Sequence, residues 1–291
     1  MVAQALRRMM PFADVVDAVL EELGERSDCT RWSVIPTGSS HLVVDVDHRI
    51  SVRIAKNPAA RENLARHSEV LRRLPKYDFH IPRPLTETKT VKGHTAVGLT
   101  WVEGIHRTGS VVPTDALSNL LEQLWATDTT HFASLLDQPG EHWGGRRRRR
   151  VILEEVVPLL LPRNRDLARE AIRDLAELEP ISPRLVHSDL TGHNMLWNAD
   201  GVLTGVIDWD HACLGDPAQD VASLAMCFGW ETIESVIDPQ IMHRARLYSR
   251  IVPMQSVAYT LVQDMDTAQV HQAVNRADEW IDTRLRRLLK R

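Results

Sequence analysis

The sequence is poor in cysteine and lacks the short motifs that mark several enzyme classes. Its three cysteines, Cys29, Cys213 and Cys227, are far apart and odd in number. They therefore suggest reduced, buried thiols in a cytoplasm and not a disulfide framework. No C-x-x-C, H-E-x-x-H or Walker A pattern is present. The missing Walker A pattern argues against a P-loop nucleotide hydrolase.

Long apolar runs and an excess of one charge are also missing. No apolar run approaches the length that spans a bilayer, and Asp14 and Asp17 follow Arg7 and Arg8 too soon for a secretory signal. The net charge of −4 argues against nucleic acid as the main partner. We expect a cytoplasmic monomer that binds neither nucleic acid nor a membrane. The 291 residues, 43% of them hydrophobic, are enough for two lobes that each have a core.

One stretch of the sequence carries a chemical signature. His187, Asp189 and Asn194 form the pattern H-x-D-L-x-x-x-N, and Asp208 follows Asn194 by fourteen residues. The residues between them read as two short strands around a turn at 198–201. Such a hairpin would bring Asn194 and Asp208 to the same side. A lone H-x-D pair is common and means little. Chance is a poor explanation for the pair followed by Asn194, a hairpin of the right length and Asp208.

Phosphoryl transfer from a nucleotide is the chemistry that needs residues of this kind at this spacing. A substrate hydroxyl must be aimed at the γ-phosphate and its proton must be accepted, a role that suits Asp189. Magnesium must neutralise charge on the phosphates, and it prefers hard oxygen ligands such as those of Asn194 and Asp208. The sequence thus predicts a kinase-like reaction that uses Mg²⁺ with ATP or GTP.

The run from residue 185 to 225, with Gly215-Asp216-Pro217 and Asp220 after the hairpin, resembles the aminoglycoside phosphotransferase family. The resemblance implies an α+β, two-lobed, protein-kinase-like fold. A β-rich nucleotide-binding lobe would span residues 1–102, and a mostly helical catalytic and substrate-binding lobe would span 103–291. It also implies that Asp189 is the catalytic base, that Asn194 and Asp208 hold the metal, and that His187 supports the loop.

Two departures from protein kinases favour a small-molecule kinase. Ser188 precedes Asp189, where many protein kinases carry an Arg that binds activation-loop phosphate. No A-P-E tripeptide follows Asp208. A phosphorylation-gated protein kinase is therefore disfavoured.

The N-terminal part predicts a helix over 11–23 and strands over 32–36, 42–46 and 50–54. The turn between the first two strands contains Gly38, Ser39 and Ser40, whose backbone N–H groups would suit phosphate oxygens. Because the turn has one glycine and not G-x-G-x-x-G, an ordinary turn is an equal alternative.

The phosphate-gripping cation of kinases lies on the third strand, and here the sequence offers Arg53, in the context V-R-I, with Lys56 as the rival. A solvated strand Arg is the plain alternative. The helix over 59–74 contains Glu69, which by the resemblance would pair with that cation. Most helix glutamates are simply solvated.

Two strands near 85–88 and 96–102 lead into Glu103-Gly104, which looks like the hinge between lobes. By the resemblance, backbone groups of Thr100 and Val102 would face the purine.

The rest of the sequence predicts helices: one capped by Thr114, one over 165–178, one that runs to about 228, and at least two over 231–291. The five arginines of 146–150 are interpreted as a solvated helix start and not as a nucleic-acid site. Asp216 and Asp220 are interpreted as helix-capping acids.

The acceptor is predicted to be an aminoglycoside-type antibiotic, by the resemblance. A macrolide or a small metabolite alcohol is the alternative, and so is a catalytically silent nucleotide-binding module. A polycationic acceptor needs unpaired carboxylates. The candidates for facing it are Asp210, Glu231, Glu234 and Asp264.

Overall fold

The computed structural model describes residues 10–26, 31–35, 40–107 and 112–285. Its contacts divide the chain into two compact units. The first unit comprises Met1–Arg107, Thr130–Leu135 and Asn194–Trp209, and the second comprises Thr108–Thr129, Leu136–His193 and Asp210–Arg291. The predicted lobe boundary after residue 102 stays a prediction. Within the described ranges, no helix is both long enough and apolar enough to cross a membrane.

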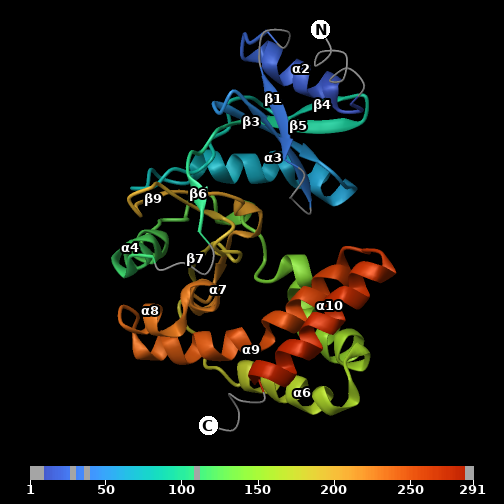
Figure 1. The fold of residues 1–291 in the computed structure, drawn as a ribbon, viewed down its shortest axis with the longest axis vertical. Coiled ribbons are helices and arrows are strands. Elements are labelled where there is room, and N and C mark those ends of the chain that lie inside the picture. The colour runs from blue at the N-terminus through green and yellow to red at the C-terminus, as the bar shows by residue number, and fades with distance from the viewer. Residues whose placement is uncertain (1–9, 27–30, 36–39, 108–111, 286–291) are drawn as a thin grey trace. The chain divides into compact units, whose positions relative to one another are not determined.

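The first unit contains a five-stranded antiparallel sheet in the order β1-β2-β3-β5-β4 (Figure 1). The strands are β1 (Trp32–Ile35), β2 (His41–Val46), β3 (Ile50–Ala55), β4 (Lys89–Val91) and β5 (His94–Thr100). The strands predicted at 42–46 and 50–54 are confirmed to within one residue at each end, and the strand predicted at 32–36 is confirmed from Trp32 to Ile35, since Pro36 lies outside the described residues. The strand predicted at 85–88 is wrong, because the N–H groups of Leu85 and Thr86 share the carbonyl of Gly98 and form no ladder.

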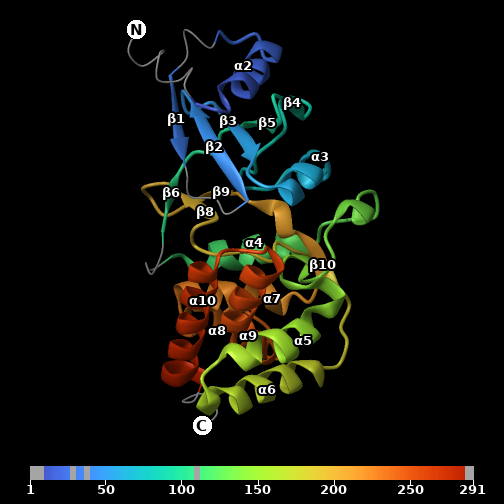
Figure 2. The same cartoon turned by 90° about the vertical axis from the view of Figure 1, so that its right-hand side faces the viewer.

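Two helices accompany this sheet, as Figures 1 and 2 show. The apolar side of α2 (Ala13–Glu22) packs on the face that carries Val52 and Ile54. Because successive strand residues point to opposite faces, Arg53 between them lies on the other face. The second helix, α3 (Pro58–Arg73), contacts β3 and β5. Its first turn is capped by the side chain of Asn57, which accepts from Ala60 N–H at 2.8 Å.

A second sheet of the first unit contains the predicted hairpin. Its order is β6-β8-β9, with β6 (Ile105–His106), β8 (Met195–Trp197) and β9 (Leu203–Val206). The antiparallel pairing of Met195 with Val206 confirms the hairpin.

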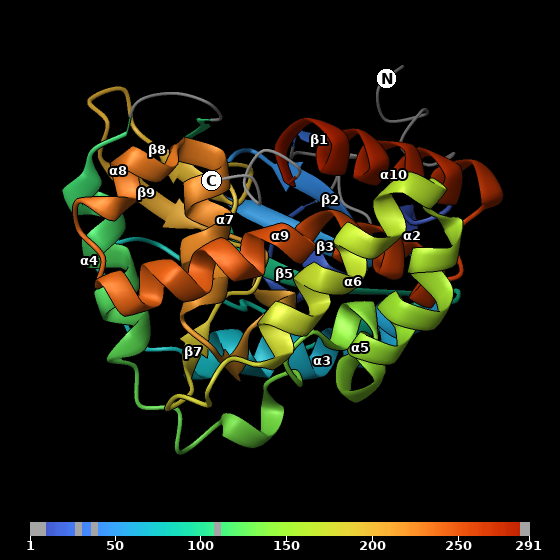
Figure 3. The same ribbon diagram turned by 90° about the horizontal axis from the view of Figure 1, so that it is seen from below.

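The second unit is mostly helical, apart from β7 (Arg184–Val186), which pairs with β10 (Cys213–Gly215). Its α-helices are α4 (Thr114–Trp125), α5 (Arg148–Arg150), α6 (Pro162–Ala176), α7 (Ala218–Phe228), α8 (Trp230–Glu234), α9 (Pro239–Val262) and α10 (Thr267–Trp280). The long helix α9 packs against α6, α7 and α10 (Figure 3). Short 3-10 and π-helical turns complete the chain: η1 (Ala133–Leu135), η2 (Glu141–Trp143), η3 (Gly145–Arg147), η4 (Val151–Val156), η5 (Val157–Leu159), η6 (Trp209–His211) and η7 (Ile281–Leu285).

Two predictions for this unit need correction. Thr114 is the first residue of α4 and not its cap, since Pro113 holds the cap position. Arg148 is not merely solvated. It is half-buried, donates to the carbonyls of Pro139 and Gly145 at 3.0 and 3.1 Å, and lies over the ring of Trp143. The other four arginines of the run are exposed, as predicted.

Candidate active site

The hairpin of β8 and β9 brings Asn194 and Asp208 to one end of the first unit's small sheet. Ile207 N–H donates to the carbonyl of Asn194 at 2.9 Å, which extends the ladder by one pair beyond Met195 and Val206. Asp208 is the next residue, and its φ of 65° turns the chain sharply there. Asn194 is buried, with 8% of its surface exposed. An amide oxygen and a carboxylate therefore lie on adjacent positions at the hairpin's open end.

An ion pair connects this hairpin with the large sheet of the same unit. The guanidinium of Arg53 donates to a carboxylate oxygen of Asp208 at 2.6 Å. The Arg53 side chain is 12% exposed, whereas that of Asp208 is 45% exposed. A cation suited to phosphate oxygens and an anion suited to a metal ion thus lie in direct contact.

The rival cation, Lys56, lies one residue beyond β3 and is exposed. Its backbone N–H donates to the carbonyl of Ser40 at 2.9 Å, so that Ser40 is held beside the end of β3. The other two candidates of this turn, Gly38 and Ser39, lie outside the described residues.

The predicted pair between Glu69 and Arg53 is wrong. The carboxylate of Glu69 instead receives Arg73 at 2.6 Å and Arg72 at 3.4 Å, both on its own helix. The hydrogen bond from Arg73 is the main reason that the pKa of Glu69 is lowered. The two arginines, three and four residues further on, are the nearest available partners on a helix surface.

The two residues predicted to contact the purine through their backbone groups, Thr100 and Val102, lie at the end of β5 and just after it. Trp101 N–H donates to Arg49 across the sheet, so the neighbouring residues direct their backbone groups the other way. Thr100 N–H donates to the carbonyl of Arg83 at 2.8 Å. Val102 forms no backbone hydrogen bond with any residue that the structure describes. Of the two predicted purine contacts, Val102 therefore keeps both backbone groups available, and Thr100 does not.

Two glycines let this segment lie directly against the hairpin. A Cβ on Gly205 of β9 would come within 2.2 Å of the Val102 side chain. A Cβ on Gly104, whose φ is +144°, would come within 2.5 Å of Thr204. The hydroxyl of Thr204 also donates to the carbonyl of Glu103 at 2.7 Å. The segment 102–104 and the hairpin therefore form one packed piece of the first unit.

The second unit holds the catalytic-loop candidates, on the chain that follows β7. His187 is fully buried, and its Nδ1 accepts from Asp189 N–H at 3.3 Å. Thr191 N–H donates back to the carbonyl of Asp189 at 2.8 Å. Ser188 has a φ of 66°, which is uncommon for a residue with a side chain. The loop therefore turns tightly at Asp189, whose side chain is half-buried.

Asp220 of α7 holds this loop, so the prediction of a simple helix cap is wrong for it. Its two carboxylate oxygens accept from His187 N–H at 2.7 Å and from Ser188 N–H at 2.9 Å. No part of Asp220 is exposed. Burial raises the pKa of its carboxyl to about 7, and the two backbone donors act in the opposite direction. The one charged residue in the mostly apolar sequence of α7 is a sequence signal for this role.

Asp216 precedes Pro217, which holds the cap position of α7, and its carboxylate accepts from the N–H of Ala218, the first residue of the helix, at 3.0 Å. It also accepts from the guanidinium of Arg244 on α9, at 2.9 Å from Nε. Both side chains are largely buried. This ion pair connects α7 with α9, and the sequence pattern held no sign of it.

Of the four acids predicted to face an acceptor, Glu231 and Glu234 share helix α8, whereas Asp210 and Asp264 lie elsewhere in the second unit. Asp210 is buried in η6, whereas Glu231 is exposed in the first turn of α8. Glu234 pairs with Arg246 at 3.1 Å. Asp264 is exposed in the turn after α9. Their role towards an acceptor stays a prediction.

The sequence is similar to those of known phosphotransferases. The model of the phosphotransferase enzyme family matches residues 31–250. A viomycin phosphotransferase from Streptomyces vinaceus is 29% identical over 217 residues, which cover 69% of this chain and 75% of that protein.

Solved structures of antibiotic phosphotransferases share the fold. The GDP complex of aminoglycoside 2'-phosphotransferase-IIIa has a TM-score of 0.78 at 17% identity, over 93% of this chain and 98% of that one. A macrolide 2'-phosphotransferase type I has a TM-score of 0.65 at 17% identity, over 90% and 95%. The fold is thus α+β and kinase-like, with a β-sheet N-terminal region and a helical C-terminal region. Since the family model covers well over half of the sequence, the chain belongs to the phosphotransferase enzyme family.

Proposed function

We propose that this protein transfers the γ-phosphate of ATP or GTP to a hydroxyl group of an aminoglycoside-type antibiotic. Support for antibiotic phosphorylation comes from the family and from the names of its relatives, which include a viomycin and several aminoglycoside phosphotransferases. Solved relatives bound to GDP, ADP or ATP support a nucleotide as the phosphate donor.

The observation that carries the proposal is the contact between Arg53 and Asp208 at the open end of the hairpin, beside Asn194. Nucleotide chemistry needs a cation for the phosphates and oxygen ligands for the metal, and these three residues provide them within one unit. In the absence of nucleotide, Arg53 and Asp208 neutralise each other. When nucleotide binds, we expect Arg53 to turn to the phosphates and to release the Asp208 oxygen.

The donor chemistry of Asn194 and Asp208 fits magnesium. Both offer hard oxygen atoms, and Mg²⁺ in nucleotide sites is commonly held by one or two protein oxygens, with phosphate oxygens and water as the other ligands. The 45% exposure of the Asp208 side chain leaves room for such ligands. The bound ion would neutralise charge on the phosphates.

Asp189 is assigned to the acceptor hydroxyl. It would orient the hydroxyl towards the γ-phosphate and accept its proton as the new bond forms. The loop can hold this geometry because Asp220 fixes the two preceding backbone N–H groups. The same support makes His187 a structural member of the loop rather than a reacting group.

The purine is assigned to the segment after β5. The free backbone groups of Val102 can bond a base edge, whereas Thr100 has already given its N–H to Arg83. Ser40, Gly38 and Ser39 are proposed to border the phosphates. Backbone contacts of this kind accept adenine or guanine, so both nucleotides belong in the test.

The test is nucleotide turnover by the purified protein with kanamycin, viomycin and erythromycin side by side, each with ATP and with GTP. Viomycin is the second candidate acceptor, because the 29%-identical relative bears its name. Affinity for kanamycin, a polyamine, should fall as salt rises, whereas erythromycin should respond weakly. Turnover with a metabolite alcohol alone would contradict the antibiotic proposal, and no turnover with any acceptor would contradict the kinase proposal.

A further inference from the structure

Three aromatic side chains of the second unit form a cluster that the assigned roles leave unused. The rings of His142 and His211 stack, with centroids 3.9 Å apart and planes inclined by 23°. The ring of Tyr259 meets His142 edge-on, with centroids 6.3 Å apart. Each of the three side chains is half-buried, so part of each remains at the surface. We call these residues the aromatic cluster.

Backbone contacts hold the three contributing segments side by side. Asp137 N–H donates to the carbonyl of Ala212 at 3.1 Å, next to a β-bridge between Asp137 and Cys213. The side-chain amide of Gln263, at the end of α9, reaches the carbonyl of His142 at 3.5 Å. The cluster is therefore built from η2, η6 and α9 in a defined geometry.

One ring of the cluster, that of His142, is uncharged. Burial lowers the pKa of His142 to about 3, and the nearby His211 lowers it further. The carboxylate of Asp137 acts in the opposite direction and raises it. The imidazole of His142 is therefore neutral at physiological pH. The face of an aromatic ring such as that of Tyr259 attracts ammonium and guanidinium groups, the neutral His142 beside it does not oppose them, and a nearby carboxylate adds to that attraction.

The position of His211 in the chain connects the cluster with the reaction. His211 is the third residue after Asp208, which the proposed function assigns to the metal. An acceptor hydroxyl must approach the γ-phosphate close to that metal. The residues that follow Asp208 are therefore well placed to meet the rest of the acceptor, and this step rests on the proposed function.

We propose that the aromatic cluster of His142, His211 and Tyr259 is an acceptor-binding surface, whose ring faces contact a cationic group of the antibiotic. It contributes to recognition of the acceptor and not of the nucleotide.

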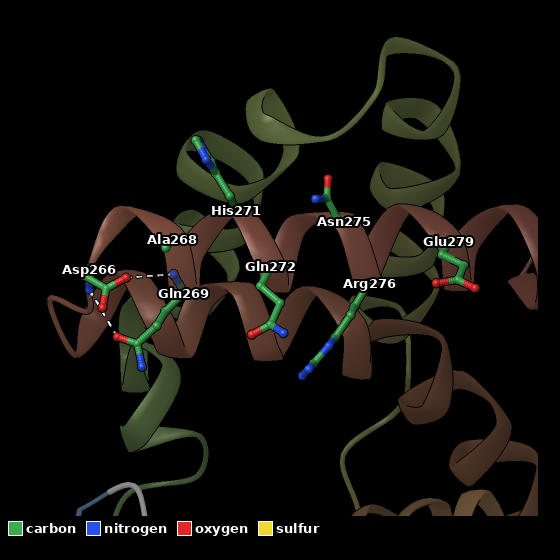
Figure 4. Close-up of a pocket in the computed structure, with 8 residues that line it drawn as sticks. All are labelled: Asp266, Ala268, Gln269, His271, Gln272, Asn275, Arg276 and Glu279. Carbon is green, nitrogen blue, oxygen red and sulfur yellow. Dashed lines mark hydrogen bonds between the residues drawn. The ribbon is translucent and has the colours of Figure 1, made fainter.

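The experiment compares His142→Ala with His142→Phe, which keeps a ring face, and with Tyr259→Leu. His271→Ala is the matched control, because His271 is an exposed histidine of the same unit, on α10 (Figure 4). Calorimetric titration gives the Kd of each variant for kanamycin, for fully N-acetylated kanamycin and for viomycin. The same titration with a non-hydrolysable nucleotide gives the nucleotide Kd, and thermal unfolding checks the fold.

We expect His142→Ala and Tyr259→Leu to raise the Kd for kanamycin roughly tenfold, with an unchanged nucleotide Kd. His142→Phe and His271→Ala should stay within about threefold of the wild type, and the acetylated compound should bind weakly to every variant. The proposal is overturned if His142→Ala binds kanamycin as the control does, if the nucleotide Kd rises equally, or if the wild type binds neither kanamycin nor viomycin. The titration measures binding without turnover. If the wild type binds kanamycin but does not phosphorylate it, the proposed reaction is refuted, and the Kd values of the variants still show whether the aromatic cluster binds the acceptor.

Discussion

The two units use carboxylates in opposite ways. In the first unit, the side chain of Asp208 is 45% exposed and forms an ion pair with Arg53. In the second unit, Asp220 is fully buried and holds two backbone N–H groups. A carboxylate that must exchange an ion pair for a metal needs solvent access, since removing a charge from water is costly. A carboxylate that fixes a loop needs to be buried, because water then cannot easily replace its hydrogen bonds.

The comparison predicts that variants of the reacting acids change kinetics, whereas variants of the holding acid change stability. The largest expected effect is that of Asp189→Asn, which removes the proton acceptor and keeps the side-chain shape. We expect kcat to fall by about 10²- to 10⁴-fold while the nucleotide Kd stays near that of the wild type. Steady-state kinetics and calorimetric titration measure the two quantities.

Asp208→Ala serves as the contrasting variant for that experiment. Because Asp208 is assigned to the metal, its loss should weaken binding of the magnesium nucleotide itself. A wild-type kcat in Asp189→Asn would rule out the assignment of Asp189 as the base, whatever the result for Asp208→Ala.

The next effect in size is on folding. Asp220→Ala leaves the N–H groups of His187 and Ser188 without an acceptor inside the protein. We expect the free energy of unfolding to fall by about 3 kcal/mol, as urea titration would measure. Asp166→Ala is the control: Asp166 is 95% exposed in its surface ion pair with Arg169, and its loss should cost less than about 1 kcal/mol. Equal losses in the two variants would contradict the holding role of Asp220.

The difference between the two units also explains what could be predicted from the sequence. The strands, the hairpin and the positions of Asn194 and Asp208 follow from local alternation and turn residues, which a short window contains. The contact between Arg53 and Asp208 joins residues 155 positions apart, and that between His187 and Asp220 spans 33. No local pattern specifies such pairs, so they became visible only in the fold.

The wrong partner for Glu69 has a different cause. The sequence E-V-L-R-R places two arginines three and four residues after Glu69, where a helix brings them into reach. The resemblance to kinases drew attention to the distant cation on β3 and away from this local one. The proposed aromatic cluster could not be predicted as a group for a third reason: its rings come from η2, η6 and α9, which are far apart in the sequence and share no pattern.

A smaller effect separates the two cations near the end of β3. If Arg53 turns to the phosphates, Arg53→Ala should raise the nucleotide KM roughly tenfold through loss of charge-assisted hydrogen bonds. Lys56→Ala should change the KM by less than about twofold, because the Lys56 side chain is exposed beyond the strand. Arg53→Lys tests geometry, since an ammonium keeps the charge but not the planar fork. If Lys56→Ala raises the nucleotide KM more than Arg53→Ala does, the phosphate-binding role belongs to Lys56.

The smallest predicted effect tests whether the two units are independent in stability as well as in chemistry. Asn57 caps α3 in the first unit, and Asp266 caps α10 in the second by accepting from Gln269 N–H at 2.8 Å (Figure 4). Replacing either residue by alanine should cost about 1 kcal/mol, because one N-terminal N–H of the helix loses its partner. Asn57→Asp and Asp266→Asn keep an accepting oxygen and should stay within a few tenths of a kcal/mol of the wild type.

Native-state hydrogen exchange can locate the loss of stability in each alanine variant. If the units open separately, Asn57→Ala lowers protection in β2, β3 and α3 alone, and Asp266→Ala lowers it in α9 and α10 alone. Equal loss of protection in both units, from either variant, would mean that the chain opens as one cooperative body and that the contrast between the units is confined to their chemistry.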